Sequence, residues 1–212
     1  MSTASPHQSL FQPDGSGISH WWRTPMLIHR WPDHGPVNAE LEGLILDRMK
    51  TSSGMTRSNV GGWHSDEELI TWPAPAVGQL KNWIVAAVRN LHRAVGVKTS
   101  PSKLQLTAWA NVNRSGDANS THEHGNHSWS GVYYVATGAA GSRATTGFLE
   151  FLDPRHGAGR LNVGLTALGA SSLVEPEPGL MVVFPSWLLH AVRPHAEAGL
   201  RISVAFNVAE VP

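Results

Sequence analysis

The sequence predicts an α+β fold in which two helices near the N-terminus brace a β-sandwich or β-barrel. Helical periodicity is confined to the first half of the 212 residues, and strand periodicity follows it. Helices followed by a run of strands, rather than alternating with strands, are typical of this architecture. The chain is long enough for one domain with a substantial core. We expect a disordered or loosely attached tail at residues 1–20 and a single domain at 21–212.

Two segments have the apolar spacing of amphipathic helices. Residues 37–50 carry aliphatic side chains at helical spacing, with Asn38 as a candidate N-cap. Residues 75–96 carry a longer apolar stripe, and Gly96 is a suitable C-terminal stop. These two helices precede every segment with clear strand alternation.

Strand periodicity begins after Pro101, where apolar and polar residues alternate. The expected strands are residues 104–112, 131–136, 147–152, 180–184 and 200–208, with 21–31 as a candidate opening strand. Residues 58–65 and 114–120 have the composition of loops.

The composition excludes several classes of protein. Lys+Arg and Asp+Glu both number 16, so the formal net charge is zero, which argues against nucleic-acid and anionic-membrane partners. The lack of cysteine excludes disulfides, zinc–thiolate sites and thiol nucleophiles. No apolar run reaches about 18 residues, and no secretion signal is visible. We therefore expect a cytoplasmic protein without a nucleic-acid or membrane partner, and we leave association into a homodimer open.

A pair of histidines, His122 and His124, is the most informative feature of the chain. In an extended backbone these two side chains point to the same side. His190 follows after several expected strands, and imidazoles suit Fe(II) sites that keep coordination positions open for reaction. Two ligand sets remain open. Strand alternation favours all three imidazoles; in the other set, Glu123 or Asp117 replaces one of them.

The last expected strand adds a cation. Arg201, Ser203 and Asn207 share one face of its alternating pattern. A guanidinium makes a bidentate, charge-assisted contact with a carboxylate, which lysine does not reproduce. An arginine beside a hydroxyl therefore suits the far end of a dicarboxylate, while an ion pair with a nearby acid is the structural alternative.

A series of motifs runs through the second half of the chain. It consists of His122-x-His124, Ser130 to Val135, Phe151 to Arg155, Pro178 to Val192, and Arg201 to Asn207, with a looser match at Asn59 to Trp63. Roughly residues 104–208, which carry the main motifs, resemble a family of 2-oxoglutarate/Fe(II)-dependent oxygenases of unassigned substrate. The resemblance implies a double-stranded β-helix (jelly-roll) core, one Fe(II) ion and 2-oxoglutarate as co-substrate.

The resemblance also implies roles for individual residues. By motif position, the metal ligands are His122, His124 and His190, and no catalytic residue is expected beyond them. The expected 2-oxoglutarate pocket contains Arg201, Ser203, Asn111 and Tyr133. Strand alternation lets only one of Tyr133 and Tyr134 face the pocket, and we expect Tyr133.

The reaction that the resemblance implies is hydroxylation of a substrate, with release of succinate and CO2. The substrate, a small molecule or a peptide, cannot be read from the sequence. Its candidate contacts are Trp63, His64, His127 and Trp187, and the candidate cavity walls are Trp109, Trp129 and Trp187. Two alternatives remain: a three-histidine iron dioxygenase or cupin that does not use 2-oxoglutarate, and a non-catalytic metal-binding jelly-roll module.

Overall fold

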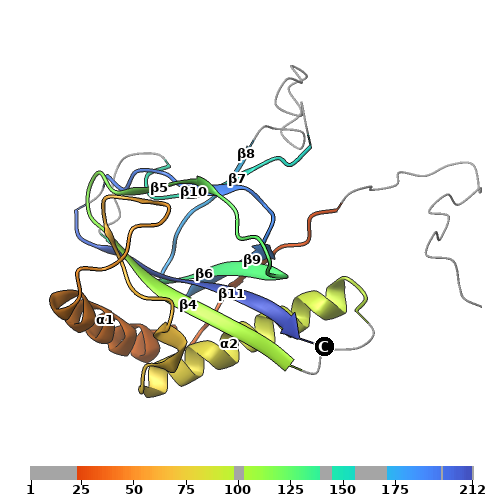
Figure 1. The fold of residues 1–212 in the computed structure, drawn as a ribbon, viewed down its shortest axis with the longest axis horizontal. Coiled ribbons are helices and arrows are strands. Elements are labelled where there is room, and N and C mark those ends of the chain that lie inside the picture. The colour runs from red at the N-terminus through yellow and green to blue at the C-terminus, as the bar shows by residue number, and fades with distance from the viewer. Residues whose placement is uncertain (1–22, 98–102, 139–144, 156–170, 197, 212) are drawn as a thin grey trace, which may run out of the picture.

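The computed structural model describes residues 23–97, 103–138, 145–155, 171–196 and 198–211, as two β-sheets and two long helices (Figure 1). The helices are α1 (His34–Thr51) and α2 (Pro75–Ala94), with a 3-10 turn η1 (Leu69–Thr71) between them. The strands are β1 (Leu27–Arg30), β2 (Asn59–Val60), β3 (Trp63–His64), β4 (Lys103–Asn113), β5 (Ala118–His122), β6 (Trp129–Thr137), β7 (Leu149–Leu152), β8 (Ser171–Val174), β9 (Leu180–Pro185), β10 (His190–Val192) and β11 (Arg201–Val211). The tail expected at residues 1–20 lies outside the described residues.

The strands form two antiparallel sheets. The six-stranded sheet has the order β1-β9-β6-β11-β4-β3, and the five-stranded sheet has the order β2-β5-β10-β7-β8. Figure 1 shows the smaller sheet lying above the larger one, with both helices below the larger sheet. β11 lies between β6 and β4 and pairs with β4 along its whole length. The predicted α+β arrangement of helices bracing a two-sheet core is confirmed.

Both helices cover the outer face of the six-stranded sheet. Apolar residues of α1 and α2 pack with side chains of β4, β6, β9 and β11 in one buried cluster, here called the helix-side cluster. The first helix begins at His34, earlier than expected, because Pro36 fits the first turn of a helix. Asn38 is not its cap; it is buried within the helix, and its Nδ2 donates to the Val135 carbonyl at 2.8 Å.

A second buried cluster lies between the two sheets. Its members are Val132, Tyr134, Leu149, Phe151, Leu180, Val182, Phe184 and Leu188. Because one face of β6 meets the helices and the other meets the smaller sheet, this strand is buried on both faces from Trp129 to Val135. The space between the sheets is therefore walled by apolar side chains.

Three short strands lie where the sequence suggested loops. β2 and β3 fall within residues 58–65, and β5 overlaps residues 114–120. β5 is polar, and it is extended because it pairs with β2 on one side and β10 on the other. Long-range pairing, rather than local propensity, produces these strands.

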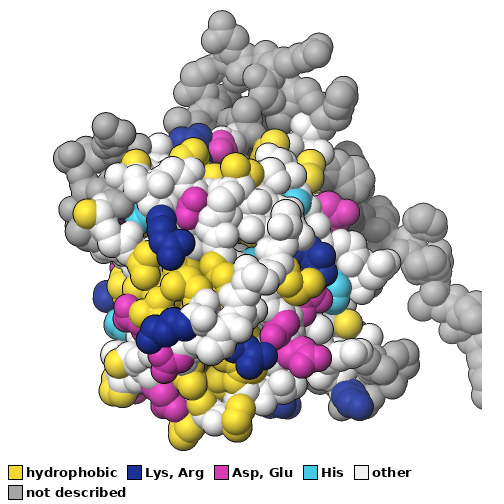
Figure 2. Space-filling model, turned by 60° about the vertical axis from the view of Figure 1, so that its left-hand side comes forward, with side chains coloured by type: hydrophobic (Ala, Val, Ile, Leu, Met, Phe, Trp, Pro, Cys, Tyr) yellow, Lys and Arg dark blue, Asp and Glu magenta, His cyan; other side chains and the backbone are white. Residues whose placement is uncertain are grey.

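The surface carries both signs of charge. Figure 2 shows Lys and Arg side chains near Asp and Glu side chains around apolar patches, without a large area of one sign on that face. Neither long helix in the described part of the chain combines the length and the apolar character needed to cross a bilayer.

Candidate metal and co-substrate site

Three histidines from two strand ends meet in the smaller sheet. His122 ends β5 and His190 begins β10, and the two residues pair directly across the ladder. His124 lies two residues beyond β5, where its backbone N–H donates to the Ser186 carbonyl at 2.9 Å. The candidate ligand atoms of the three histidines all lie within 4.8 Å of one another. The structure therefore brings together the three side chains that the sequence singled out.

Backbone carbonyls orient two of the rings. Nδ1 of His190 lies 2.8 Å from the Leu188 carbonyl, and Nδ1 of His122 lies 2.7 Å from the Ser120 carbonyl. A carbonyl only accepts, so Nδ1 carries the proton and Nε2 keeps its lone pair. Metal-binding histidines are commonly held in this way. The Ser58 hydroxyl, 3.3 Å from Nε2 of His122, is a long contact that a ligated ion would replace.

Burial keeps these imidazoles neutral. It lowers the pKa of His124 to about 3, assisted by the charges of His190, His122 and His127. It lowers the pKa of His190 to about 4, assisted by His122, and it also lowers the pKa of His122. At neutral pH the three rings therefore offer lone pairs rather than protons, as metal ligation requires.

Neither candidate carboxylate joins this cluster. Oδ2 of Asp117 accepts the backbone N–H of Arg114 at 2.7 Å, so this side chain closes a turn. Glu123 is exposed and lines an outer groove. Within the described residues, the group able to hold a metal consists of the three histidines alone. The geometry thus supports the three-imidazole set over the carboxylate alternative.

A buried arginine lies on the facing sheet. Arg201 is only 1% exposed, and its Nε donates to the Gly147 carbonyl at 3.1 Å. Its Nη1 donates to Asn113 Oδ1 at 3.4 Å and Ser203 Oγ at 3.3 Å, while Nη2 has no partner among the described residues. No described acidic side chain forms an ion pair with it. An uncompensated buried charge costs several kcal/mol, so this cation fits a site for an anion.

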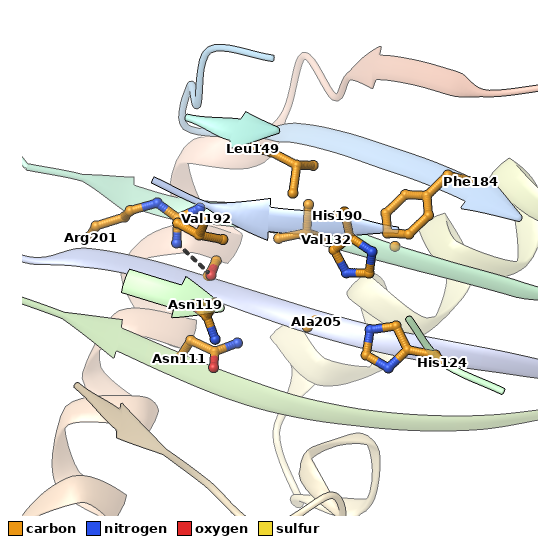
Figure 3. Close-up of a pocket in the computed structure, with 12 residues that line it drawn as sticks. Asn111, Asn119, His124, Val132, Leu149, Phe184, His190, Val192, Arg201 and Ala205 are labelled. Atoms are coloured by element: carbon orange, nitrogen blue, oxygen red, sulfur yellow. Dashed lines mark hydrogen bonds between the residues drawn. The ribbon is translucent and has the colours of Figure 1, made fainter. Parts of the chain in front are cut away.

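One cavity connects the arginine with the histidines. Figure 3 shows Arg201 at one end and His124 and His190 at the other, with the dashed bond from Arg201 to Ser203. The lining residues are Asn111, Asn119, His124, Gly131, Val132, Leu149, Phe184, His190, Val192, Arg201, Ser203 and Ala205. Most of its walls are apolar, and the polar groups gather at its two ends. This arrangement suits a small diacid that reaches from a metal to a guanidinium.

Tyr133 was expected in this pocket, and that expectation is wrong. Its hydroxyl donates to Asn38 Oδ1 at 2.5 Å, and its ring packs against Trp83 of α2. Tyr134 points to the opposite face of β6, where its ring centroid lies 5.1 Å from Cζ of Arg201. Tyr134 is opposite Ser203 in the ladder, so both side chains face the space between the sheets. Asn111, Arg201 and Ser203 line the cavity as predicted.

An open groove of about 390 Å³ lies outside the histidines. Its lining residues are Arg57, Ser58, His64, Glu67, Trp109, Ser120, His122, Glu123, His124 and Asn207. Of the predicted substrate contacts, only His64 lines it. Trp109 forms part of its wall, as predicted, whereas Trp129 belongs to the helix-side cluster.

Three predicted substrate contacts lie elsewhere. Trp63 alternates with His64 and so points to the helix side, where its Nε1 donates to the Ser52 carbonyl at 2.9 Å. Trp187 lies in the turn after β9 and is 51% exposed. Nδ1 of His127 contacts its own loop at the Gly125 carbonyl, 3.0 Å away. Asn207 was not predicted as a groove residue, although its alternation with Arg201 was a usable signal.

Comparisons with known proteins agree with this geometry. Residues 107–207 match the family model described as "Putative 2OG-Fe(II) oxygenase". No curated protein matches the chain. A prolyl-4-hydroxylase from Pseudomonas putida is similar in structure, with a TM-score of 0.60 and 16% identity over 89% of this chain and 93% of that chain.

Two further solved structures show the same likeness. A prolyl hydroxylase from Trichoplax adhaerens, in complex with a hypoxia inducible factor peptide fragment, has a TM-score of 0.61 and 10% identity, covering 87% of this chain and 83% of that chain. HygX from Streptomyces hygroscopicus, with nickel and 2-oxoglutarate bound, has a TM-score of 0.58 and 14% identity, covering 89% and 83%. At these identities the likeness concerns the fold, and it confirms the double-stranded β-helix.

The fold, the histidine cluster and the family match define the class of this protein. It is an Fe(II)- and 2-oxoglutarate-dependent oxygenase. Within that class, residues 107–207, just under half of the chain, are similar to the 2OG-Fe(II) oxygenase family named above, as the motifs in the sequence indicated.

Proposed function

We propose that the protein hydroxylates a C–H bond of its substrate at an iron ion held by His122, His124 and His190. In the same reaction dioxygen is the oxidant: one of its oxygen atoms enters the hydroxylated product and the other enters succinate, as 2-oxoglutarate is oxidised to succinate and CO2. The observation that carries the proposal is Arg201, a buried guanidinium without an anionic partner, at the opposite end of one cavity from His124 and His190, two of the three clustered imidazoles.

The side chains present fit both groups. Three imidazole nitrogens suit Fe(II) and leave coordination positions free. When bound, iron would activate dioxygen with electrons from 2-oxoglutarate, and this chemistry would oxidise a C–H bond. The chain contributes orientation: Arg201 and Ser203 hold the distal carboxylate, and Tyr134 supports the guanidinium from one side. Apolar walls around Phe184 restrict the access of water to the cavity.

Arg201 also favours this function over the alternatives that the sequence left open. An iron dioxygenase without 2-oxoglutarate, or a metal-binding module without activity, does not require an unpaired cation buried at the far end of the cavity from the histidines. The cost of burying that charge is offset only when an anion binds. A diacid that also ligates the metal meets this requirement.

Anaerobic titration tests the proposal directly. We expect one Fe(II) or Mn(II) ion per chain, and 2-oxoglutarate binding that is much tighter in the metal-loaded protein than in the metal-free protein. A crystal structure with Mn(II) and N-oxalylglycine should place the metal on the three histidines and the distal carboxylate on Arg201. Failure to bind metal, or binding of 2-oxoglutarate away from Arg201, would contradict it.

A further inference from the structure

We infer that His64 and Asn207 bind a secondary amide of the substrate across the face of Trp109, which makes the substrate an amide-bearing compound such as a peptide. The inference rests on the function proposed above, because it assigns the groove beside the metal histidines to the substrate. It concerns three side chains of that groove: one acceptor, one donor and the aromatic wall between them.

His64 supplies the acceptor. It is 3% exposed, and its Nδ1 lies 2.6 Å from the Ser65 carbonyl. Because that carbonyl only accepts, Nδ1 carries the proton and Nε2 keeps a lone pair. Burial lowers the pKa of His64, so the ring is neutral at physiological pH. No described residue bonds Nε2, and the ring lines the groove.

Asn207 supplies the donor. Its Oδ1 accepts a hydrogen bond from Ser130 Oγ at 2.7 Å, in a setting where both residues are buried. That bond fixes the amide plane and turns the Nδ2 group away from Ser130. Nδ2 has no partner among the described residues, and Asn207 lines the same groove as His64. The Ser130 hydroxyl therefore decides which end of the Asn207 amide is offered to a ligand.

Trp109 lies between these two groups. Its ring stacks on His64, with centroids 5.6 Å apart and planes 13° apart, and its other neighbour is His124, also at 5.6 Å. β4 carries Trp109 and lies between β3 and β11, which carry His64 and Asn207. An amide lying on the indole would thus be held next to one of the metal histidines.

The spacing fits a trans amide. His64 is level with Asn111 of β4, and Asn207 is level with Thr107 of the same strand. His64 and Asn207 therefore lie two strand spacings apart across the sheet and four residues apart along it, or about 16 Å between backbones. The N and O atoms of an amide, each with a hydrogen bond of ordinary length, require about 8 Å between the protein partners.

Trp109 lies midway along the diagonal from His64 to Asn207. The His64 ring stacks on Trp109, and the Asn207 Nδ2 is turned away from Ser130 of β6, so each side chain reaches about 4 Å toward Trp109 and together they close the difference between the two spacings. In a trans amide the N–H and the C=O point in opposite directions. The N–H can therefore donate to Nε2 of His64 while the C=O accepts from Nδ2 of Asn207 on the other side.

The unpaired acceptor of His64 and the unpaired donor of Asn207 make the groove selective for ligands that carry both an amide N–H and a carbonyl. A ligand that lacks the amide N–H leaves Nε2 of His64 without a partner, and one that lacks the carbonyl leaves Nδ2 of Asn207 without a partner. Sites of this kind reject analogues that lack the matching polar group. A groove of about 390 Å³ accommodates a short peptide segment.

Binding of defined amides tests the inference. Protein loaded with Mn(II) and 2-oxoglutarate, after its affinity for both has been measured, is titrated with two probe sets. One set contains N-acetyl amino-acid N-methylamides, one for each standard side chain; the other contains acetyl-Gly-Gly-Xaa-Gly-Gly-amides. We expect members of either set to bind, and binding confined to the longer set would identify the peptide as the source of the amide. The ester analogue of the best probe, which lacks one N–H, should bind about tenfold more weakly.

Variants then assign the two roles. Asn207→Asp keeps the shape and the bond from Ser130 but removes the donor, and His64→Leu removes the acceptor; each should weaken the best probe by about tenfold or more. His64→Gln retains an acceptor and should restore binding, and His29→Gln, at an exposed histidine of β1 outside the groove, is the matched control. Absence of binding by both sets, or equal affinities in all variants, overturns the amide assignment. Loss of metal or 2-oxoglutarate binding by the unmodified protein would instead contradict the proposed function.

Discussion

Replacing Arg201 by methionine separates the two roles that a buried arginine can have. As a structural residue, it would stabilise the fold through an ion pair, and removing one partner of a buried pair costs about 3–5 kcal/mol. As a co-substrate anchor, Arg201 lowers the stability of the ligand-free protein until an anion binds. The structure shows three bonds from Arg201 to neutral acceptors, two of them 3.3 Å or longer, and an unpaired Nη2.

The expected magnitudes follow from these contacts. Methionine fills similar space without the charge, so the metal-free variant should remain folded, with a free energy of unfolding equal to or above that of the unmodified protein. Two charge-assisted hydrogen bonds to the distal carboxylate contribute about 1.5–3 kcal/mol each, or about 3–6 kcal/mol together. The dissociation constant for 2-oxoglutarate should therefore rise by about 10²- to 10⁴-fold.

Calorimetric titration of 2-oxoglutarate into the Mn(II)-loaded protein measures the dissociation constant, and denaturant unfolding of the metal-free protein measures the free energy of unfolding. Arg193→Met is the matched control. Arg193 pairs with Glu150 at 2.9 Å and is partly exposed, so its loss should change stability little and leave 2-oxoglutarate affinity unchanged. An Arg201→Met protein that binds 2-oxoglutarate normally, or that unfolds, would refute the reasoning.

Three further predictions concern the same site. His190→Ala should remove Fe(II) binding while circular dichroism shows an intact fold, and unchanged metal content after anaerobic loading would exclude His190 as a ligand. In the folded protein the pKa values of His124 and His190 are about 3 and about 4, below the ordinary 6.5 of the unfolded chain. Between these pH values the unfolded chain binds more protons, so the metal-free protein should lose stability as the pH falls from about 6.5 to 4. A flat pH profile of the unfolding midpoint would contradict this prediction. Tyr133→Phe should cost about 1–3 kcal/mol of stability by leaving Asn38 Oδ1 without a donor, with no change in 2-oxoglutarate affinity, whereas Tyr134→Leu should weaken that affinity several-fold; the reverse pattern would mean that the tyrosines were assigned to the wrong faces.

The parts of the site that could be read from the sequence depend on local geometry. Alternation along one strand places Arg201, Ser203 and Asn207 on a common face, whatever the rest of the fold does. The same holds for the two-residue spacing of His122 and His124. The helix at Pro75–Ala94 could also be predicted from the sequence, because its apolar stripe is continuous over several turns.

Tyr133 shows where this reasoning stops. A strand exposed on one face reveals its inward side through polar residues on the other, but β6 is buried on both faces for most of its length. Its sequence therefore gives no sign of which tyrosine meets the helices. The answer depends on the register with β11, which shifts beside Ser203.

The sequence alone determined the order of helices and strands, the face of β11 that carries the anchor, and the histidines available for a metal. These features arise from periodicity within single segments, so neighbouring residues decide them. Only the tertiary structure decided that β5 is extended, that Tyr134 rather than Tyr133 supports Arg201, and that His64 and Asn207 share a groove. Each of these depends on which distant strands pair and in what register, and pairing energy is gained only when the sheets assemble.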